Sequence, residues 1–122
     1  MILITGATGF LGGHLLYHLL KQKKQVLALK RPHSNTYPVR QIFKTYGQEE
    51  EKLFDKIQWV DGDIVDYASL NQIDEPIESI YHLAAMVSFN PGDRNKLLKT
   101  NVLGTSNMID FALEKNISEF IH

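Results

Sequence analysis

Apolar and polar residues follow one another in blocks whose period changes along the chain, from short continuous apolar runs to stripes with helical spacing. The first run, Met1 to Thr5, is apolar, contains β-branched residues and is ended by Gly6. Such a run is typical of a strand buried on both faces, as in a parallel sheet. Leucines then recur at helical spacing, which predicts a helix over residues 9–22.

The same alternation of strand and helix patterns continues to the last residue. We expect further strands at residues 25–31, 56–63, 79–85 and 119–122. Helices are expected around residues 39–46, 49–54, 66–73 and 91–116. The last of them carries one long apolar stripe, formed by Leu97, Leu98, Val102, Thr105, Met108, Ile109, Ala112 and Leu113. Strands that alternate with helices favour an α/β fold, a parallel sheet of about five strands in the order 3-2-1-4-5 with helices on both faces.

Composition narrows the functional classes. The chain has 122 residues, a net charge of −1 and no cysteine. This charge excludes the basic surface that nucleic-acid binding requires, and we expect no nucleic-acid partner. No apolar run approaches the roughly 20 residues of a membrane helix, so no membrane partner is expected. The absence of cysteine excludes disulfides and thiol catalysis and fits a cytoplasmic protein; we expect no metal site.

A glycine-rich stretch, "ILITGATGFLG", follows the first predicted strand and opens the first predicted helix. Gly6 allows a tight turn, Gly9 allows a pyrophosphate to approach the backbone, and Gly12 lets the helix pack against the strand. The N–H groups at the helix start, from Gly9 through Phe10 to Leu11, have no partners within the helix and point toward a phosphate. The hydroxyl of Thr8 adds a donor. The context predicts a Rossmann-type dinucleotide site.

Four motifs in order extend this prediction over the chain: "TGATGFLG", "GDI" at residues 62–64, "YHLAA" at 81–85 and "TNVLGT" at 100–105. Together they resemble the extended short-chain dehydrogenase/reductase family, which includes sugar-nucleotide epimerases, dehydratases and dihydroflavonol-reductase-like enzymes. The resemblance implies a nicotinamide cofactor and a small-molecule substrate. It leaves the substrate open.

The resemblance also assigns residues to the cofactor. It implies that Asp63 and Ile64 lie at the adenine, that Ala84 and Ala85 line the path of the ribose and nicotinamide, and that Asn101 helps to hold the active site. The simpler interpretation of Asp63 is a turn residue before a helix. Asn101 also falls on the apolar stripe of its helix, which predicts a buried amide bonded to backbone.

His82 lies in the fourth predicted strand. We interpret it as a core histidine that is satisfied by backbone, and we assign it no chemical role.

The end of the second strand bears on which dinucleotide binds. NAD sites of this type place an acidic residue there for the ribose 2′-hydroxyl. Residues 25–48 contain no acidic residue, and the strand ends in Lys30 and Arg31. An arginine there suits a 2′-phosphate, which favours NADP over NAD. The alternative is that both residues are solvated charges.

No catalytic residue is assigned. The resembled family uses a serine or threonine after the fifth strand and a Tyr-x-x-x-Lys pair. Tyr17 and Lys21 have that spacing but lie on the first predicted helix, facing away from the nicotinamide. Ser88 follows the fourth strand. We therefore expect residues 1–122 to be one dinucleotide-binding domain without the catalytic and substrate-binding part of a reductase or epimerase. A non-catalytic dinucleotide-sensing regulator and a non-functional remnant are the alternatives.

The end of the chain predicts self-association. The fifth strand leaves an open edge at Phe120 and Ile121, beside the apolar surface of the long helix over residues 90–116. Open edges and apolar patches recruit other chains. A homodimer is the simplest closed assembly.

Overall fold

A single five-stranded parallel sheet forms the centre of the protein. The computed structural model describes residues 1–84 and 90–122. The strands are β1 (Ile2–Thr5), β2 (Val26–Lys30), β3 (Gln58–Asp61), β4 (Ser79–His82) and β5 (Glu119–Ile121). They lie side by side in the order β3-β2-β1-β4-β5, and all paired strands are parallel. The predicted fold class and strand order are thus confirmed.

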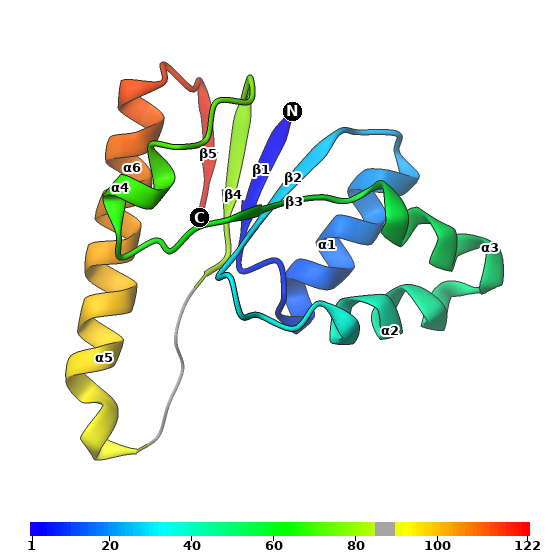
Figure 1. Cartoon of the computed structure of the whole chain (residues 1–122), viewed down its shortest axis with the longest axis horizontal. Helices are drawn as coiled ribbons and strands as arrows, with labels where there is room; N and C mark the ends of the chain where they lie inside the picture. Colours follow the sequence, from blue (N-terminus) through cyan, green and yellow to red (C-terminus); the bar gives the residue numbers. More distant parts are fainter. Residues whose placement is uncertain (85–89) are drawn as a thin grey trace.

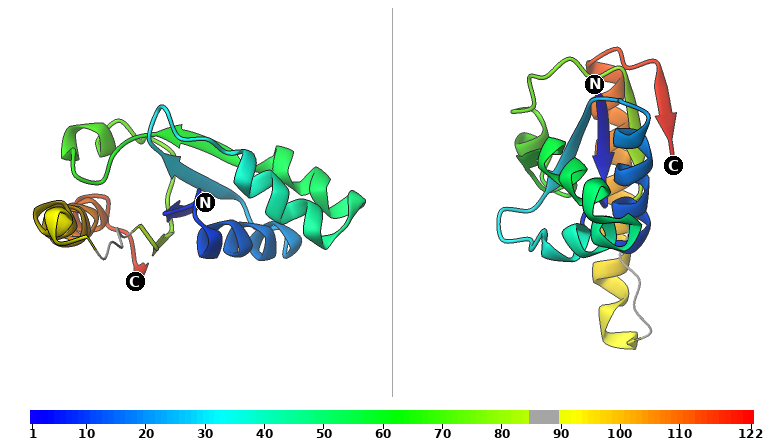
Figure 2. Two further views of the ribbon diagram at one scale, coloured as in Figure 1. Left: turned by 90° about the horizontal axis from the view of Figure 1, so that it is seen from below. Right: turned by 90° about the vertical axis from the view of Figure 1, so that its right-hand side faces the viewer.

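Helices cover both faces of this sheet, as Figures 1 and 2 show. One layer consists of α1 (Phe10–Lys21), α2 (Tyr37–Tyr46), α3 (Gln48–Glu51) and the 3-10 helix η1 (Lys52–Lys56). The other consists of α4 (Tyr67–Leu70), the 3-10 turn η2 (Pro91–Asp93), α5 (Arg94–Leu98), the π-helical turn η3 (Lys99–Leu103) and α6 (Gly104–Glu114). In Figure 1, α5 extends beyond the carboxyl ends of the strands.

The side chains of β1 are divided between the two layers, because successive residues of a strand point to opposite faces. Ile2 and Ile4 belong to the apolar cluster under α1 and α2. Leu3 belongs to the cluster under α6. All four residues of the strand are buried, as the continuous apolar run predicts.

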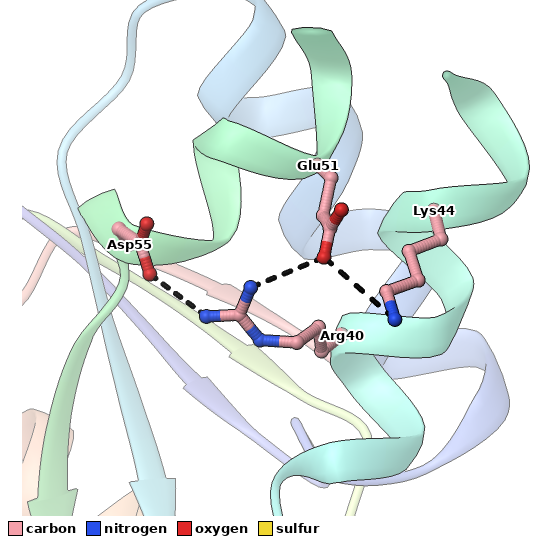
Figure 3. A network of polar contacts seen from close by, with 4 residues as sticks. All are labelled: Arg40, Lys44, Glu51 and Asp55. Carbon is pink, nitrogen blue, oxygen red and sulfur yellow. Dashed lines mark hydrogen bonds and ion pairs between the residues drawn. The ribbon is translucent and has the colours of Figure 1, made fainter. Parts of the chain in front are cut away.

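The segment between β2 and β3 is braced by one arginine (Figure 3). Arg40 on α2 pairs with Glu51 through Nη1 at 3.1 Å and with Asp55 through Nη2 at 2.9 Å. Its guanidinium carbon also lies 4.5 Å from the centre of the Phe54 ring. The cation thereby holds α2 against α3 and η1.

The predicted helix over residues 91–116 is interrupted by the π-helical turn η3. A π turn contains more residues than an α turn and changes which residues face the core. Met108 and Ala112 are buried as the stripe predicts. Val102 and Leu113, predicted on the same stripe, are 64% and 71% exposed. The single apolar stripe was therefore wrong for part of its length.

In the part of the chain that the structure describes, no helix combines the length and the apolar character needed to cross a lipid bilayer.

Candidate functional site

A groove of about 730 Å³ runs along the carboxyl ends of the strands. We call it the carboxyl-edge groove. Its lining residues are Thr5, Gly6, Thr8, Gly9, Leu29, Lys30, Arg31, Ser34, Gly62, Asp63, Ile64, Val65, Leu83, Ala84, Lys96, Lys99 and Thr100. Open parallel sheets bind ligands at this edge, where the strand order reverses on the two sides of β1.

A second hollow, of about 800 Å³, lies at the opposite edge, near the end of α1 and the start of β2. Lys21, Lys23, Lys24 and Lys56 line it together with Glu49 and Glu50. Its charged residues have both signs, and the amino ends of parallel strands are not where such folds bind ligands. The carboxyl-edge groove is therefore the candidate site.

The glycine turn presents open backbone donors at the start of α1. The N–H of Gly9 donates to the carbonyl of Gly6 at 3.2 Å, and the N–H of Gly13 donates to the carbonyl of Gly9 at 2.9 Å. The latter is the first bond of the helix. The N–H groups of Phe10, Leu11 and Gly12 precede it and have no acceptor among the described residues. Such groups and the helix dipole attract an anion.

Two glycines make this turn sterically possible. Gly6 has a φ of +72°, and a Cβ there would lie 2.6 Å from the carbonyl carbon of Leu83. A Cβ on Gly12 would collide with the carbonyl oxygen of Gly6. Among the described residues, the Gly6 oxygen at 3.4 Å would be the only atom within 4 Å of a Cβ on Gly9. The space beside Gly9 is thus open, whereas Gly6 and Gly12 are packed by backbone.

The turn after β3 is held in place by contacts with α6. The Nδ2 of the buried Asn107 donates to the carbonyl of Ile64 at 2.7 Å. A Cβ on Gly104 would lie 2.5 Å from Cδ1 of Ile64, so α6 approaches this turn closely. Within the turn, Oδ1 of Asp63 accepts the N–H of Val65 at 3.1 Å. Asp63 and Ile64 are consequently fixed at the wall of the groove.

The two cations at the end of β2 differ in their surroundings. Nζ of Lys30 pairs with Oδ1 of Asp61 at 2.7 Å, and the Lys30 side chain is largely covered. Arg31 is exposed and has no ion pair among the residues that the structure describes. Arg31 is the better placed of the two for an external anion.

His82 is satisfied by side chains rather than by backbone, which corrects the interpretation from the sequence. Its Nδ1 lies 2.7 Å from Oγ1 of Thr5, and its Nε2 lies 3.0 Å from Oγ1 of Thr105. Burial, with a smaller effect from His122, lowers the pKa of His82 to about 4. The ring is therefore neutral at neutral pH.

Most of the site residues expected from the sequence gather around the groove. Those that line it are Gly6, Thr8, Gly9, Lys30, Arg31, Asp63, Ile64 and Ala84. Phe10, Leu11 and Gly12 contribute through the helix start. Asn101 lies in η3 and is half-buried, whereas Asn107 on α6 is buried. Ala85 and Ser88 lie outside the described residues.

Tyr17, the tyrosine of the Tyr-x-x-x-Lys spacing on α1, packs in the core and has no place in the groove, as expected. Tyr17 is buried, and its ring stacks on that of Tyr46 with centroids 3.7 Å apart. It is not among the residues that line the carboxyl-edge groove.

Sequence reasoning expected the long helix at the site through the motif at residues 100–105, but it missed Lys96 and Lys99. Lys96, Lys99 and Thr100 form part of the wall of the groove. Lysines on a helix are ordinarily solvated, and no motif distinguishes these two. Their placement follows from the tertiary position of α5 and η3 alone.

Comparisons with known proteins agree with this geometry. A family model described as "Male sterility protein", an NAD-binding family, matches residues 4–122. A protein of Synechocystis sp. named "Putative dihydroflavonol 4-reductase" is 34% identical over 98% of this chain and 31% of its own length.

Two solved structures share the fold. A thiolation-reductase di-domain from an archaeal non-ribosomal peptide synthetase has a TM-score of 0.80 and 29% identity, over 98% of this chain and 26% of its own. A short-chain dehydrogenase/reductase superfamily protein from Agrobacterium tumefaciens, solved with bound NAD, has a TM-score of 0.74 and 25% identity, over 98% and 31%.

The chain spans about a third of the length of the curated relatives that it matches. The match of the family model extends over the glycine turn, the groove and the long helix. The chain belongs to the NAD-binding family described as male sterility protein, and it is the NAD-binding portion of an extended short-chain dehydrogenase/reductase.

Proposed function

We propose that this chain binds NADP(H) in the carboxyl-edge groove and supplies the cofactor-binding part of a nicotinamide-dependent reductase or epimerase. The observation that carries the proposal is the set of open N–H groups of Phe10, Leu11 and Gly12 beside the unobstructed space at Gly9. These donors suit the pyrophosphate of a dinucleotide. In this proposal residues 1–122 form one dinucleotide-binding domain.

The other residues expected at the site contact the two ends of the cofactor. Asp63 and Ile64 hold the adenine, because the turn that carries them is fixed by Asn107 at the groove wall. Ala84 leaves room for the ribose, and Asn101 supports the nicotinamide side. The chemistry supplied by the cofactor is hydride transfer between its nicotinamide and a small-molecule substrate, a carbonyl compound or a sugar nucleotide.

The preference for NADP rests on this chain's own residues. Arg31 is an exposed cation at the end of β2, and residues 25–48 contain no carboxylate to hold the 2′-hydroxyl of NAD. A guanidinium can form forked hydrogen bonds to a phosphate. The related Agrobacterium protein holds NAD, so the preference distinguishes this chain from that one.

Titration of the purified chain with NADPH and with NADH, followed by cofactor fluorescence, tests the proposal. We expect saturable binding of both, with NADPH the tighter ligand. If neither dinucleotide saturates the protein at millimolar concentration, the groove is not a cofactor site. If NADH binds more tightly, the NADP preference is wrong while the site remains.

We also propose that the chain forms a homodimer through its second helical layer. Leu98, Val102, Ile109 and Leu113 are exposed large apolar residues on α5, η3 and α6. Ile121 on the edge strand β5 is 41% exposed. A self-complementary pairing of this surface would remove it from water.

A further inference from the structure

A chain of three polar side chains, two of them buried and the third half-buried, joins β1, β4 and α6. Thr5 ends β1, His82 ends β4, and Thr105 lies in the first turn of α6. The Thr5 hydroxyl oxygen is 2.7 Å from Nδ1 of His82, and the Thr105 hydroxyl oxygen is 3.0 Å from Nε2 of the same ring. Thr5 is fully buried and His82 is 1% exposed, so water does not compete for the bond between them. Thr105 is half-buried, at the outer end of the chain.

The contacts of Thr5 determine where the protons lie. Its hydroxyl oxygen accepts the N–H of Ala84 at 3.2 Å. Its own hydrogen has one remaining acceptor among the described residues, which is Nδ1 of His82. A buried hydroxyl hydrogen without an acceptor is costly, so Thr5 donates to Nδ1. Nε2 then carries the ring proton and donates to Thr105.

The neutral state of the ring agrees with this arrangement. Burial and the nearby His122 ring, whose centroid is 5.3 Å away, both oppose a charge on His82. A protonated ring would also need Thr5 to accept a second hydrogen bond, while the hydrogen of Thr5 lost its acceptor.

The three residues connect the two walls of the carboxyl-edge groove. Thr5 directly precedes Gly6, whose backbone packs against Leu83 and Ala84. Thr105 lies on α6, which follows α5 and η3 without a break in the chain. Lys96, Lys99 and Thr100 on α5 and η3 form the other wall of the groove. His82 itself is not among the residues that line the groove.

We propose that His82 is a positioning residue of this site: as the Nε2–H tautomer it fixes the distance between the glycine turn and the long helix, and thereby sets the affinity for the dinucleotide. This inference rests on the proposed cofactor binding. It assigns His82 a directional role, because an apolar side chain could fill the same space but would leave both threonine hydroxyls free to turn.

Substitutions at Thr105 separate positioning from packing. Thr105→Val keeps the volume and removes the hydroxyl, whereas Thr105→Ser keeps the hydroxyl and removes a methyl group. Thr45→Val is the matched control, because the hydroxyl of Thr45 donates only to the carbonyl of Ile42 on the exposed side of α2. Thr5 is unsuitable, since its hydroxyl also receives the Ala84 N–H.

NADPH titration and thermal unfolding of the 122-residue chain are measured for all four proteins. We expect Thr105→Val to lower the affinity for NADPH roughly three- to tenfold, which is the effect of one lost hydrogen bond. Thr105→Ser should bind like the wild type although it lacks a methyl group. Thr45→Val should leave affinity unchanged. If affinity instead follows the unfolding midpoint in all variants, His82 is only a packing residue and the inference is wrong.

Nitrogen NMR of the His82 ring in the unmodified chain tests the proton assignment without any substitution. The Nε2–H tautomer is expected, and an Nδ1–H tautomer would overturn the assignment. Failure of the inference and of the proposed function are distinct. If the wild type binds no dinucleotide, both the proposed function and the inference are wrong. If the wild type binds NADPH and Thr105→Val binds it equally tightly, only the positioning role of His82 is wrong.

Discussion

Nζ of Lys30 lies 2.7 Å from Oδ1 of Asp61, its direct partner in the pairing of β2 with β3. The charge of Lys30 is therefore balanced at the edge of the sheet, whereas the adjacent Arg31 has no ion-pair partner among the described residues. Two neighbouring cations that look equivalent in the sequence thus have different surroundings. This distinction leads to a prediction for each of them.

Arg31→Ala should remove most of the preference for NADPH. We expect NADPH to bind about tenfold or more weakly, because a charge-assisted forked bond to the 2′-phosphate is lost. NADH, which has no 2′-phosphate, should change by less than about twofold. Parallel titrations with the two reduced cofactors measure the difference. Equal losses for both would show that Arg31 does not contact the 2′-phosphate.

Asp61→Asn should act in the opposite direction. It releases Lys30 from its ion pair, so a second cation can turn toward the 2′-phosphate. We expect NADPH to bind about two- to fivefold more tightly at low salt, with the gain reduced by added salt because the site is solvated. Asp55→Asn, which removes an ion pair of Arg40 away from the groove, is the control. An unchanged ratio of NADPH to NADH affinity would mean that Lys30 remains held away from the ligand.

Substitutions at two glycines of the turn should have different effects, one on dinucleotide binding and the other on stability. In Gly9→Val the backbone, with φ −85°, accepts any residue, and the fold should persist while the side chain occupies the space of the pyrophosphate. Dinucleotide binding should be lost with a near-normal unfolding midpoint. Gly12→Ala should instead lower stability by roughly 2 kcal/mol or more, because its Cβ meets a backbone carbonyl. Normal binding by Gly9→Val would refute the phosphate-binding turn.

The low pKa of His82 gives a pH dependence of stability. The folded pKa of about 4 lies below the ordinary value of 6.5, so the unfolded chain binds the proton more readily between these values. Stability is full above pH 6.5 and falls as the pH decreases toward 4, by roughly 2 to 3 kcal/mol in total. Urea unfolding across this range measures the slope. His82→Gln should flatten it, whereas His33→Gln, at an exposed position, should not.

Two substitutions that each place a charge on the surface should identify which surface forms the dimer. Light scattering after size exclusion, at tens of micromolar protein, is expected to give the mass of a dimer. Leu113→Glu places a charge on the outer face of α6 and should yield monomer if the helices form the contact. Ile121→Lys should do so only if the β5 edges pair. A monomeric wild type at this concentration would end the homodimer proposal.

The sequence predicts the architecture because its signals are local. The apolar run at Ile2–Thr5 and the change to helical spacing after Gly9 predict a strand and a helix without knowledge of the rest of the chain. The long helix was less predictable, since the turn at Lys99–Leu103 shifts the phase of the apolar stripe. No periodicity in the sequence marks a π turn in advance.

The partners of polar side chains are the part that sequence reasoning could not reach. The Lys30–Asp61 pair depends on the register of two strands, and the buried amide of Asn107 depends on where α6 meets the turn after β3. His82 was expected to bond to backbone, but its partners come from β1 and α6. Each of these contacts joins residues far apart in the chain, where spacing carries no information.

Thr5 and His82 are also 77 positions apart, and this separation has a consequence for synthesis. During translation the glycine turn leaves the ribosome long before β4, and until then the groove has only one wall. A nascent chain therefore cannot hold the cofactor until the centre of the sheet has closed. Because a ligand stabilises only the form that binds it, a bound dinucleotide would stabilise the pairing of β1 with β4, which forms after the pairing of β1 with β2. Cofactor supply in the cell would then act as a late checkpoint on folding, after the glycine turn itself is complete.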